Sequence, residues 1–183
     1  MYTMAAIMQG DRTFLLQNFA TAAAGEWCHY NAGAGALSYF ALTTGAEGQV
    51  DAGLNSSGLA LLSGVAAGDS AALCAVFAQV LSQCRDVKTA IDRVVECISA
   101  QADPLLRGHV ALGTSECIAV LEYGGGHVEH EVITHGFVAK SDCCQLEIVD
   151  GAGQKNEPSY GRMVEFAEGL YAWLPTLDGE EVV

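Results

Sequence analysis

Short apolar segments of strand length alternate with turns rich in Gly, Asn and Asp along most of the chain. The first two, Tyr2 to Met8 and Arg12 to Phe19, are joined by the turn Gln9-Gly10-Asp11, which predicts a buried hairpin. The small-residue segment 20–35 is expected to be a loop. Further strands are predicted at 36–42, 49–54, 59–65, 109–114, 117–123, 128–134 and 137–140.

Three other segments repeat apolar residues at i, i+3, i+4 and i+7, the spacing of an amphipathic helix. Asp69 or Ser70 is expected to cap the first helix, Asp86 to cap the second, and Pro158 or Ser159 to begin the third. Strands, two helices, strands and a helix follow one another in this order. That order predicts an α+β fold in which two antiparallel sheets face each other and helices cover the outside, and it also permits a simpler two-layer α+β fold.

Composition is that of a globular domain. The 183 residues are 51% hydrophobic and 16% charged, which predicts one domain over residues 1–174 followed by an acidic tail at 175–183. Eight basic against 22 acidic residues give a formal charge of −14, and no basic cluster interrupts the acidic surface. Nucleic acid and anionic membrane surfaces are therefore excluded as expected partners.

The seven cysteines are an odd number, and several fall within the predicted helices, where a thiol behaves as a small apolar side chain. A reducing compartment fits this usage, so the expected localisation is cytoplasmic. The first residues lack a basic segment, and no apolar run approaches the ~18 residues of a membrane span. Neither secretion nor membrane insertion is expected.

Few residues suggest metal, cofactor or nucleophile chemistry. Cys28 and His29 are adjacent, and adjacent residues of a strand point to opposite faces. His127 and His130 would also face opposite sides of their strand, and no further ligand lies at a recognised spacing. Phosphate-binding Gly loops and Gly-x-Ser-x-Gly turns are missing from the sequence. No metal and no cofactor are expected.

The turn Asn55-Ser56-Ser57-Gly58 joins two apolar strands and holds polar groups at the rim of a hydrophobic sheet. An ordinary hairpin turn has the same composition, because Asn and Gly tolerate positive φ. The surrounding segment, Gly53 to Ala60, is similar to the Gly-(Met/Leu)-Asn-x-x-Gly-Leu-Ala motif of N-terminal-nucleophile (Ntn) hydrolases. The similarity is to the acyl-coenzyme A:6-aminopenicillanic acid acyltransferase-like group and its choloylglycine hydrolase relatives.

Other segments resemble this family in the same order along the chain, from Tyr2 to Leu174. Asp11 to Phe19 resembles its second strand, the two helices and the hairpin ending in Leu121-Glu122 follow, and Ser159 to Arg162 comes late. The resemblance implies an Ntn-type four-layer αββα sandwich, here shortened at the C-terminus. It also implies that a partner subunit supplies the closing strands, or that the chain forms a homo-oligomer, because an uncovered sheet edge tends to pair.

In such enzymes a terminal residue exposed by processing is the nucleophile, its own α-amine is the base, and the Asn turn contributes to the oxyanion hole. The resemblance assigns the oxyanion role to Asn55 and places Tyr2, Asn18 and Asp142 at the rim of the site. It implies amide hydrolysis or acyl transfer on a small acyl or amide compound.

The sequence departs from the family at several of these positions. Tyr2-Thr3 stands where the family has Cys-Thr, Ala20 stands where it has Asp, and Asp142 stands where an oxyanion donor is expected. Two hypotheses follow. The chain is a pseudoenzyme that retains the scaffold for binding a small ligand or for assembly, or it is an active amidase or acyltransferase with Thr3 as nucleophile after loss of Met1 and Tyr2.

Overall fold

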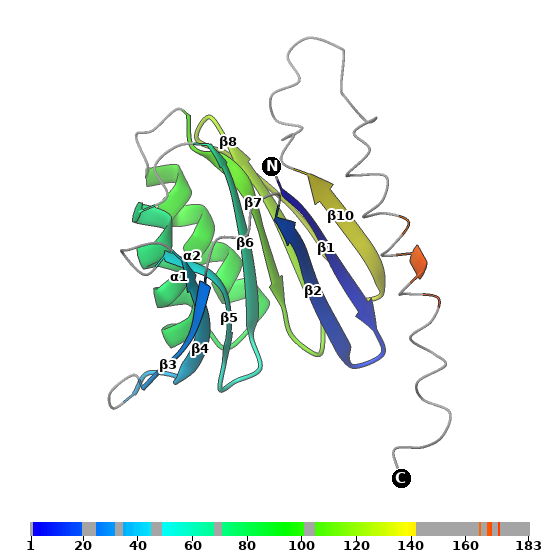
Figure 1. The fold of residues 1–183 in the computed structure, drawn as a ribbon, viewed down its shortest axis with the longest axis horizontal. Helices are drawn as coiled ribbons and strands as arrows, with labels where there is room; N and C mark the ends of the chain where they lie inside the picture. Colours follow the sequence, from blue (N-terminus) through cyan, green and yellow to red (C-terminus); the bar gives the residue numbers. More distant parts are fainter. Residues whose placement is uncertain are drawn as a thin grey trace.

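The computed structural model describes residues 2–19, 25–31, 35–44, 49–67, 71–100 and 105–141, together with four helical residues, Glu165, Glu168, Gly169 and Ala172. These residues form a mixed α+β structure in which two antiparallel sheets pack face to face (Figure 1). The elements are β1 (Tyr2–Gln9), β2 (Arg12–Phe19), β3 (Gly25–Tyr30), β4 (Tyr39–Thr44), β5 (Gln49–Asn55), β6 (Ala60–Ala67), α1 (Ala71–Gln83), α2 (Val87–Ala100), β7 (Arg107–Gly113), β8 (Ile118–Gly124), β9 (His127–Ile133) and β10 (Gly136–Ser141).

The larger sheet has seven strands in the order β3-β4-β5-β6-β7-β8-β9, and the smaller has three in the order β10-β1-β2. Helices α1 and α2 cover the face of the larger sheet that is turned away from the smaller one (Figure 1). Described residues therefore form three layers, helices, large sheet and small sheet. The predicted pair of facing sheets and the predicted helical layer are both confirmed.

The core between the helices and the large sheet is the larger one. Phe77, Leu81 and Val94 from the helices pack there against Leu112 and Tyr123 from the sheet. Helix α1 approaches β5 closely, since a Cβ added at Gly53 would come within 2.3 Å of a Leu81 methyl carbon. This close approach brings the end of α1 onto the turn that follows β5.

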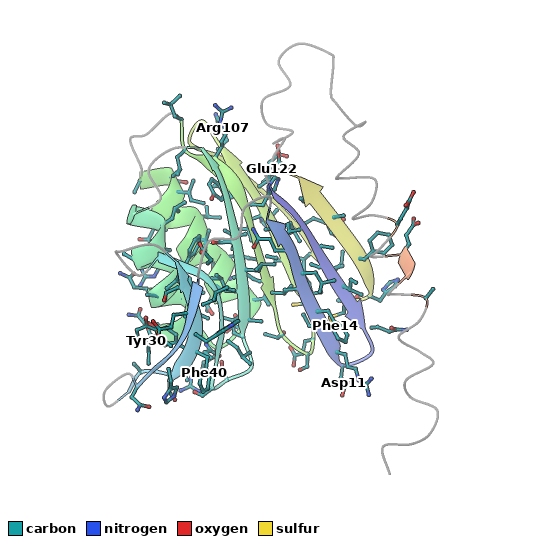
Figure 2. The ribbon with its side chains drawn as sticks, viewed as in Figure 1. Asp11, Phe14, Tyr30, Phe40, Arg107 and Glu122 are labelled. Carbon is teal, nitrogen blue, oxygen red and sulfur yellow. The ribbon has the colours of Figure 1, made fainter. Side chains whose placement is uncertain are left out.

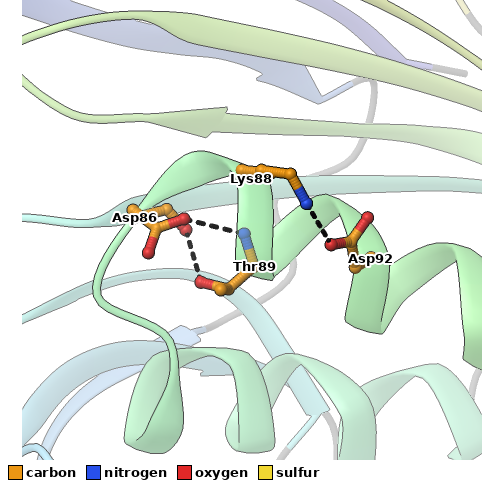
Figure 3. A network of polar contacts seen from close by, with 4 residues as sticks. All are labelled: Asp86, Lys88, Thr89 and Asp92. Atoms are coloured by element: carbon orange, nitrogen blue, oxygen red, sulfur yellow. Dashed lines mark hydrogen bonds and ion pairs between the residues drawn. The ribbon is translucent and has the colours of Figure 1, made fainter.

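Helix α2 begins as the sequence predicts. The carboxylate of Asp86 accepts a hydrogen bond from the Thr89 amide at 2.8 Å, and the Thr89 hydroxyl donates to the Asp86 carbonyl at 3.1 Å (Figure 3). Within the first turns of the helix, Lys88 and Asp92 form an exposed ion pair at 2.9 Å. The Asp86 carboxylate thus satisfies one of the amide groups that the first turn of a helix leaves without a partner.

The core between the sheets follows the alternation of β1. Met4, Ala6 and Met8 face the large sheet, whereas Ala5 and Ile7 face outward, and all five are buried. The outer face of the small sheet is therefore apolar as well, with Phe14, Leu16, Phe137 and Ala139 beside Ala5 and Ile7.

One predicted loop is wrong. Within 20–35 the residues Gly25–Tyr30 form the edge strand β3, paired with β4 from Gly25↔Thr44 to Tyr30↔Tyr39. Its exposed side chains lie in a segment rich in small residues, so the sequence lacks the apolar alternation that identified the other strands. Asp69, Ser70 and most of the predicted helix 159–174 lie outside the described residues. Neither described helix is both long and apolar enough to span a membrane.

Candidate functional site

Three of the residues assigned to the site by resemblance lie together at one end of the small sheet. Thr3 is opposite Asn18 on β2 and opposite Ser141 on β10, and Tyr2 is opposite Phe19. The start of β1 is therefore flanked by the end of β2 and the end of β10. Asp142 follows Ser141 in the chain but lies outside the described residues.

Asn55 lies at the opposite end of the sandwich. Thr13, near the other end of the β1–β2 hairpin, hydrogen-bonds the Thr114 carbonyl, which directly follows β7. At this end β7 pairs with Ala60, the first residue of β6, and the Asn55 turn leads directly into that strand. Thr13 pairs with Met8. Thr3 is five residues from Met8 along β1, which is about 17 Å at the rise of an extended strand.

The Asn55 side chain is buried, 4% exposed, and its hydrogen bonds hold a turn and a helix end together. Its Nδ2 group donates to the carbonyls of Leu81 at 3.0 Å and Cys84 at 2.8 Å. Its Oδ1 atom accepts from the Ser57 amide at 3.0 Å, the Ser57 hydroxyl at 2.7 Å and the Leu59 amide at 3.0 Å.

These contacts use the full donor capacity of the amide. An asparagine side chain has two N–H bonds, and both point to carbonyl oxygens at the C-terminal end of α1, where carbonyls lack partners within the helix. A substrate oxyanion at Asn55 would have to displace one of these carbonyls. The structure thus gives Asn55 a structural function and does not bring it to Thr3.

A second set of polar residues lies between the two sheets. His109 on β7 and Glu122 on β8 are cross-strand partners, both buried, with His109 Nε2 3.7 Å from Glu122 Oε2. Lys140 on β10 reaches across from the small sheet and donates to the same Glu122 oxygen at 3.4 Å. We call His109, Glu122, Lys140 and Gln17 of β2 the inter-sheet polar cluster.

Gln17 joins this cluster through the register of the small sheet. Met4 is paired with Gln17 on one side and with Lys140 on the other, so the three side chains share the face that is turned to the large sheet. Both polar atoms of the Gln17 side chain are buried, and neither has a hydrogen-bond partner. Because Met4 directly follows Thr3, the cluster lies at the end of the sandwich where β1 begins. Figure 2 shows Glu122 at this end and Asp11 at the other.

The charges of the cluster favour a neutral ligand. Lys140 faces the Glu122 carboxylate, and Glu129 of β9 lies directly opposite Glu122 on the next strand. A bound anion would be repelled by these two carboxylates at short range. An amide group instead offers one donor and one acceptor, which match the carboxylate of Glu122, the ammonium of Lys140 and the amide of Gln17.

Sequence reasoning missed this cluster, although a signal for it exists. Glu122 is the only charged residue in the buried strand from Ile118 to Tyr123, and His109 stands in the similarly apolar strand β7. A charged residue in a buried strand needs a partner. The pattern alone did not identify Lys140 as that partner, because the two strands belong to different sheets.

Other candidate nucleophiles and ligands do not form a site among the described residues. Burial raises the pKa of the Cys84 thiol, which keeps it protonated near neutral pH. Cys28 Sγ lies 3.9 Å from Thr43 Oγ1, whereas the His29 ring contacts the Phe40 ring in a tilted arrangement, so the two adjacent residues use opposite faces of β3 as expected. Within the described residues, no group of three His, Cys, Asp or Glu side chains is placed to hold a metal ion.

Comparison with known proteins adds no family assignment. No protein-family model matches the chain, and no curated protein sequence matches it. The resemblance to Ntn hydrolases therefore stays a prediction from the motifs, and the functional argument depends on the geometry of the two polar sites.

Replacing Lys140 with methionine is expected to lower the free energy of unfolding by about 2 kcal/mol, because the Glu122 carboxylate then lacks its charged donor in a mostly buried position. Urea denaturation of the two proteins measures this difference. Lys88→Met removes a lysine whose ion pair is exposed on α2 and should leave the midpoint unchanged. Equal effects of the two substitutions would show that Lys140 does not stabilise Glu122.

Proposed function

We propose that this chain is a non-catalytic protein on an Ntn-hydrolase-type scaffold, which binds a small neutral acyl amide at the inter-sheet polar cluster. The observation that carries the proposal is the position of Asn55. The residue assigned to the oxyanion hole uses both amide hydrogens on the carbonyls of Leu81 and Cys84, at the end of α1, and lies at the far end of the sandwich from Thr3. Without that donor near Thr3, the hydrolytic machinery of the family is incomplete.

The scaffold part of the proposal is supported by the layers and by the outer face of the small sheet. Ala5 and Ile7 are buried on that face, which supports a further layer over it. Glu165, Glu168, Gly169 and Ala172 are helical and exposed, and their spacing of 3, 4 and 7 marks one solvent face of a helix. The intervening sequence is largely apolar. A C-terminal helix on the small sheet would complete the αββα order of an Ntn-type sandwich.

The ligand part is supported by hydrogen-bonding capacity. Gln17 has a buried donor and a buried acceptor without partners, which costs free energy unless a ligand satisfies them. Lys140 is the most exposed charged group of the cluster and would donate to a ligand carbonyl. A neutral secondary amide would satisfy these groups without adding charge beside Glu122 and Glu129.

A catalytic alternative is favoured by one observation. Thr3 directly precedes Met4, the residue paired with both Gln17 and Lys140, so a free α-amine at Thr3 would begin the chain beside acid and base groups. In this alternative, processing removes Met1 and Tyr2. The Thr3 hydroxyl then attacks the amide carbonyl, its proton passes through the α-amine to the departing amine as the C–N bond breaks, and water hydrolyses the resulting ester to the acid and Thr3. Oxyanion stabilisation would then come from groups other than Asn55.

The binding proposal predicts that N-methylhexanamide, a neutral secondary amide, binds at the cluster. Titration followed by ¹H–¹⁵N spectra should give saturating shifts at the amides of His109, Glu122 and Lys140. Lys140→Met should weaken binding by about tenfold or more, because a hydrogen bond from a charged donor is lost, whereas Lys88→Met should not change it. Shifts spread over the surface, or equal affinity of the Lys140 variant, would contradict the proposed site. Tighter binding of hexanoate would show that the ligand class is wrong.

A further inference from the structure

The large sheet extends beyond the small sheet on one side. Strand β2 packs on β6 and β7, and β1 packs on β6 and β8, so β3, β4 and the end of β5 reach past the edge at β2. Large apolar side chains are exposed on this extension: Trp27 is 62%, Phe40 53% and Leu54 50% exposed. Figure 2 shows Phe40 on the opposite side of the molecule from Phe14 of the small sheet.

These side chains lie on one face, the same face that meets the small sheet elsewhere. Phe40 is the cross-strand partner of Leu54 and of His29, and residues opposite each other in a ladder share a face. Ala52, two residues from Leu54, packs in the core between the sheets. We call Trp27, His29, Phe40 and Leu54 the uncovered face. It is an extension of the inter-sheet core without the second sheet.

Two strand edges border this region. Among the described strands, β2 pairs only with β1, and β3 pairs only with β4. Strands β2 and β3 run in opposite directions. Strands β2 and β6 begin at the same end of the sandwich. Thr13, near the start of β2, contacts Thr114, and the preceding residue Gly113 pairs with Ala60 at the start of β6. Strands β6, β5, β4 and β3 alternate in direction, so β3 runs antiparallel to β2.

We propose that two copies of this chain form a twofold dimer in which β3 of each copy pairs with β2 of the other. The axis runs along the strands between the two sheet layers and turns the uncovered face of one copy onto that of the other. Each layer then contains one continuous sheet, made of the small sheet of one copy and the large sheet of its partner. The β2–β3 pairs are antiparallel, since rotation about an axis along the strands preserves their direction.

This dimer accounts for both the uncovered face and the two strand edges. The uncovered face is buried against its own counterpart, which makes the interface self-complementary as a twofold axis requires. Both sheet edges gain hydrogen-bonded neighbours. Direct pairing of β2 with β2 about an axis perpendicular to the sheets is excluded, because the two large sheets would then occupy the same layer and overlap.

The negative charge of the chain opposes dimerisation and makes it depend on salt concentration. Each copy carries a formal charge of −14, so two copies repel each other at low ionic strength. Salt screens this repulsion and also strengthens apolar association. Dimerisation should therefore become stronger as salt increases, the opposite of an interface held by ion pairs.

Light scattering during size exclusion tests the proposal on the full chain. The wild-type protein should have twice its 19.1 kDa mass, with less dissociation at about 0.5 M than at about 0.05 M salt. Phe40→Lys with Leu54→Lys should raise the dimer dissociation constant at least about 30-fold, because two apolar anchors of the interface are replaced by charges. Both side chains are exposed in the monomer, so the variant should fold. Val132→Lys, on the exposed strand β9, is the matched control and should remain dimeric.

Hydrogen exchange distinguishes edge pairing from simple face contact. Amides of β2 and β3 should be protected in the wild-type dimer and should exchange faster in the double variant. A wild-type monomer at all concentrations would overturn the proposal. A dimer that persists in the double variant, or one without protection of β2 and β3, would also overturn it.

Discussion

Asn55→Ala is expected to lower the free energy of unfolding by about 4 kcal/mol. The substitution leaves the carbonyls of Leu81 and Cys84 and the amide of Leu59 without their partners, and each unsatisfied buried group costs about 1–3 kcal/mol. The turn after β5 and the end of α1 lose their connection at the same time. Urea denaturation followed by circular dichroism measures the difference.

Two further substitutions test which hydrogen bonds of Asn55 stabilise the turn. Asn55→Asp keeps the acceptor for Ser57 and Leu59 but directs a carboxylate oxygen at two carbonyls, so it should destabilise about as much as alanine. Ser57→Ala removes one of the three hydrogen bonds to Asn55 Oδ1 and leaves both bonds of Nδ2, so it should cost at most about 1 kcal/mol. An Asn55→Ala protein of wild-type stability would show that these hydrogen bonds do not hold the turn.

Gly108→Ala is expected to destabilise the protein by about 3 kcal/mol, at the upper end of overpacking effects. A Cβ at this position would lie 2.2 Å from the Gly64 carbonyl oxygen and 2.6 Å from the Tyr123 hydroxyl. The Gly64 oxygen belongs to the backbone of β6 and cannot move without shifting the strand. The thermal midpoint and the urea midpoint of unfolding should both fall.

Gly126→Ala is the matched control in the adjacent β8–β9 turn. Its φ of +80° disfavours an L-residue, but an added Cβ would meet no atom within 4 Å, so the expected cost is about 1 kcal/mol. Equal losses at Gly108 and Gly126 would contradict the close approach of β6 and β7 at Gly108.

Periodicity predicted every described strand except β3, and both described helices, because most of these elements have one or two buried faces. Met4, Ala6 and Met8 alternate with Ala5 and Ile7 on two apolar faces, which gives a continuous apolar run. Edge strand β3 was missed because Trp27 and His29 are exposed and its pairing with β4 depends on a distant segment. The sequence also did not predict which strands belong to which sheet, since β10 follows β9 in the chain but pairs with β1.

Candidate residues were harder to predict than elements. The motif around Asn55 predicted a turn between two strands, but the contacts of the Asn55 side chain are with Leu81 and Cys84, which are 26 and 29 residues away. Glu122 and Lys140 meet only because two sheets pack against each other. Thr3 and Asn18 were identified by resemblance, and the register places them opposite each other.

Intact mass after incubation with an acylating probe tests the absence of a catalytic nucleophile most directly. We would treat the purified chain with p-nitrophenyl hexanoate, measure its mass and map any adduct by peptide sequencing. The binding proposal predicts a chain that retains Met1 and Tyr2 and carries no adduct at Thr3. A chain that begins at Thr3 and carries one hexanoyl group there, released again by water, would establish the N-terminal nucleophile and contradict the non-catalytic function.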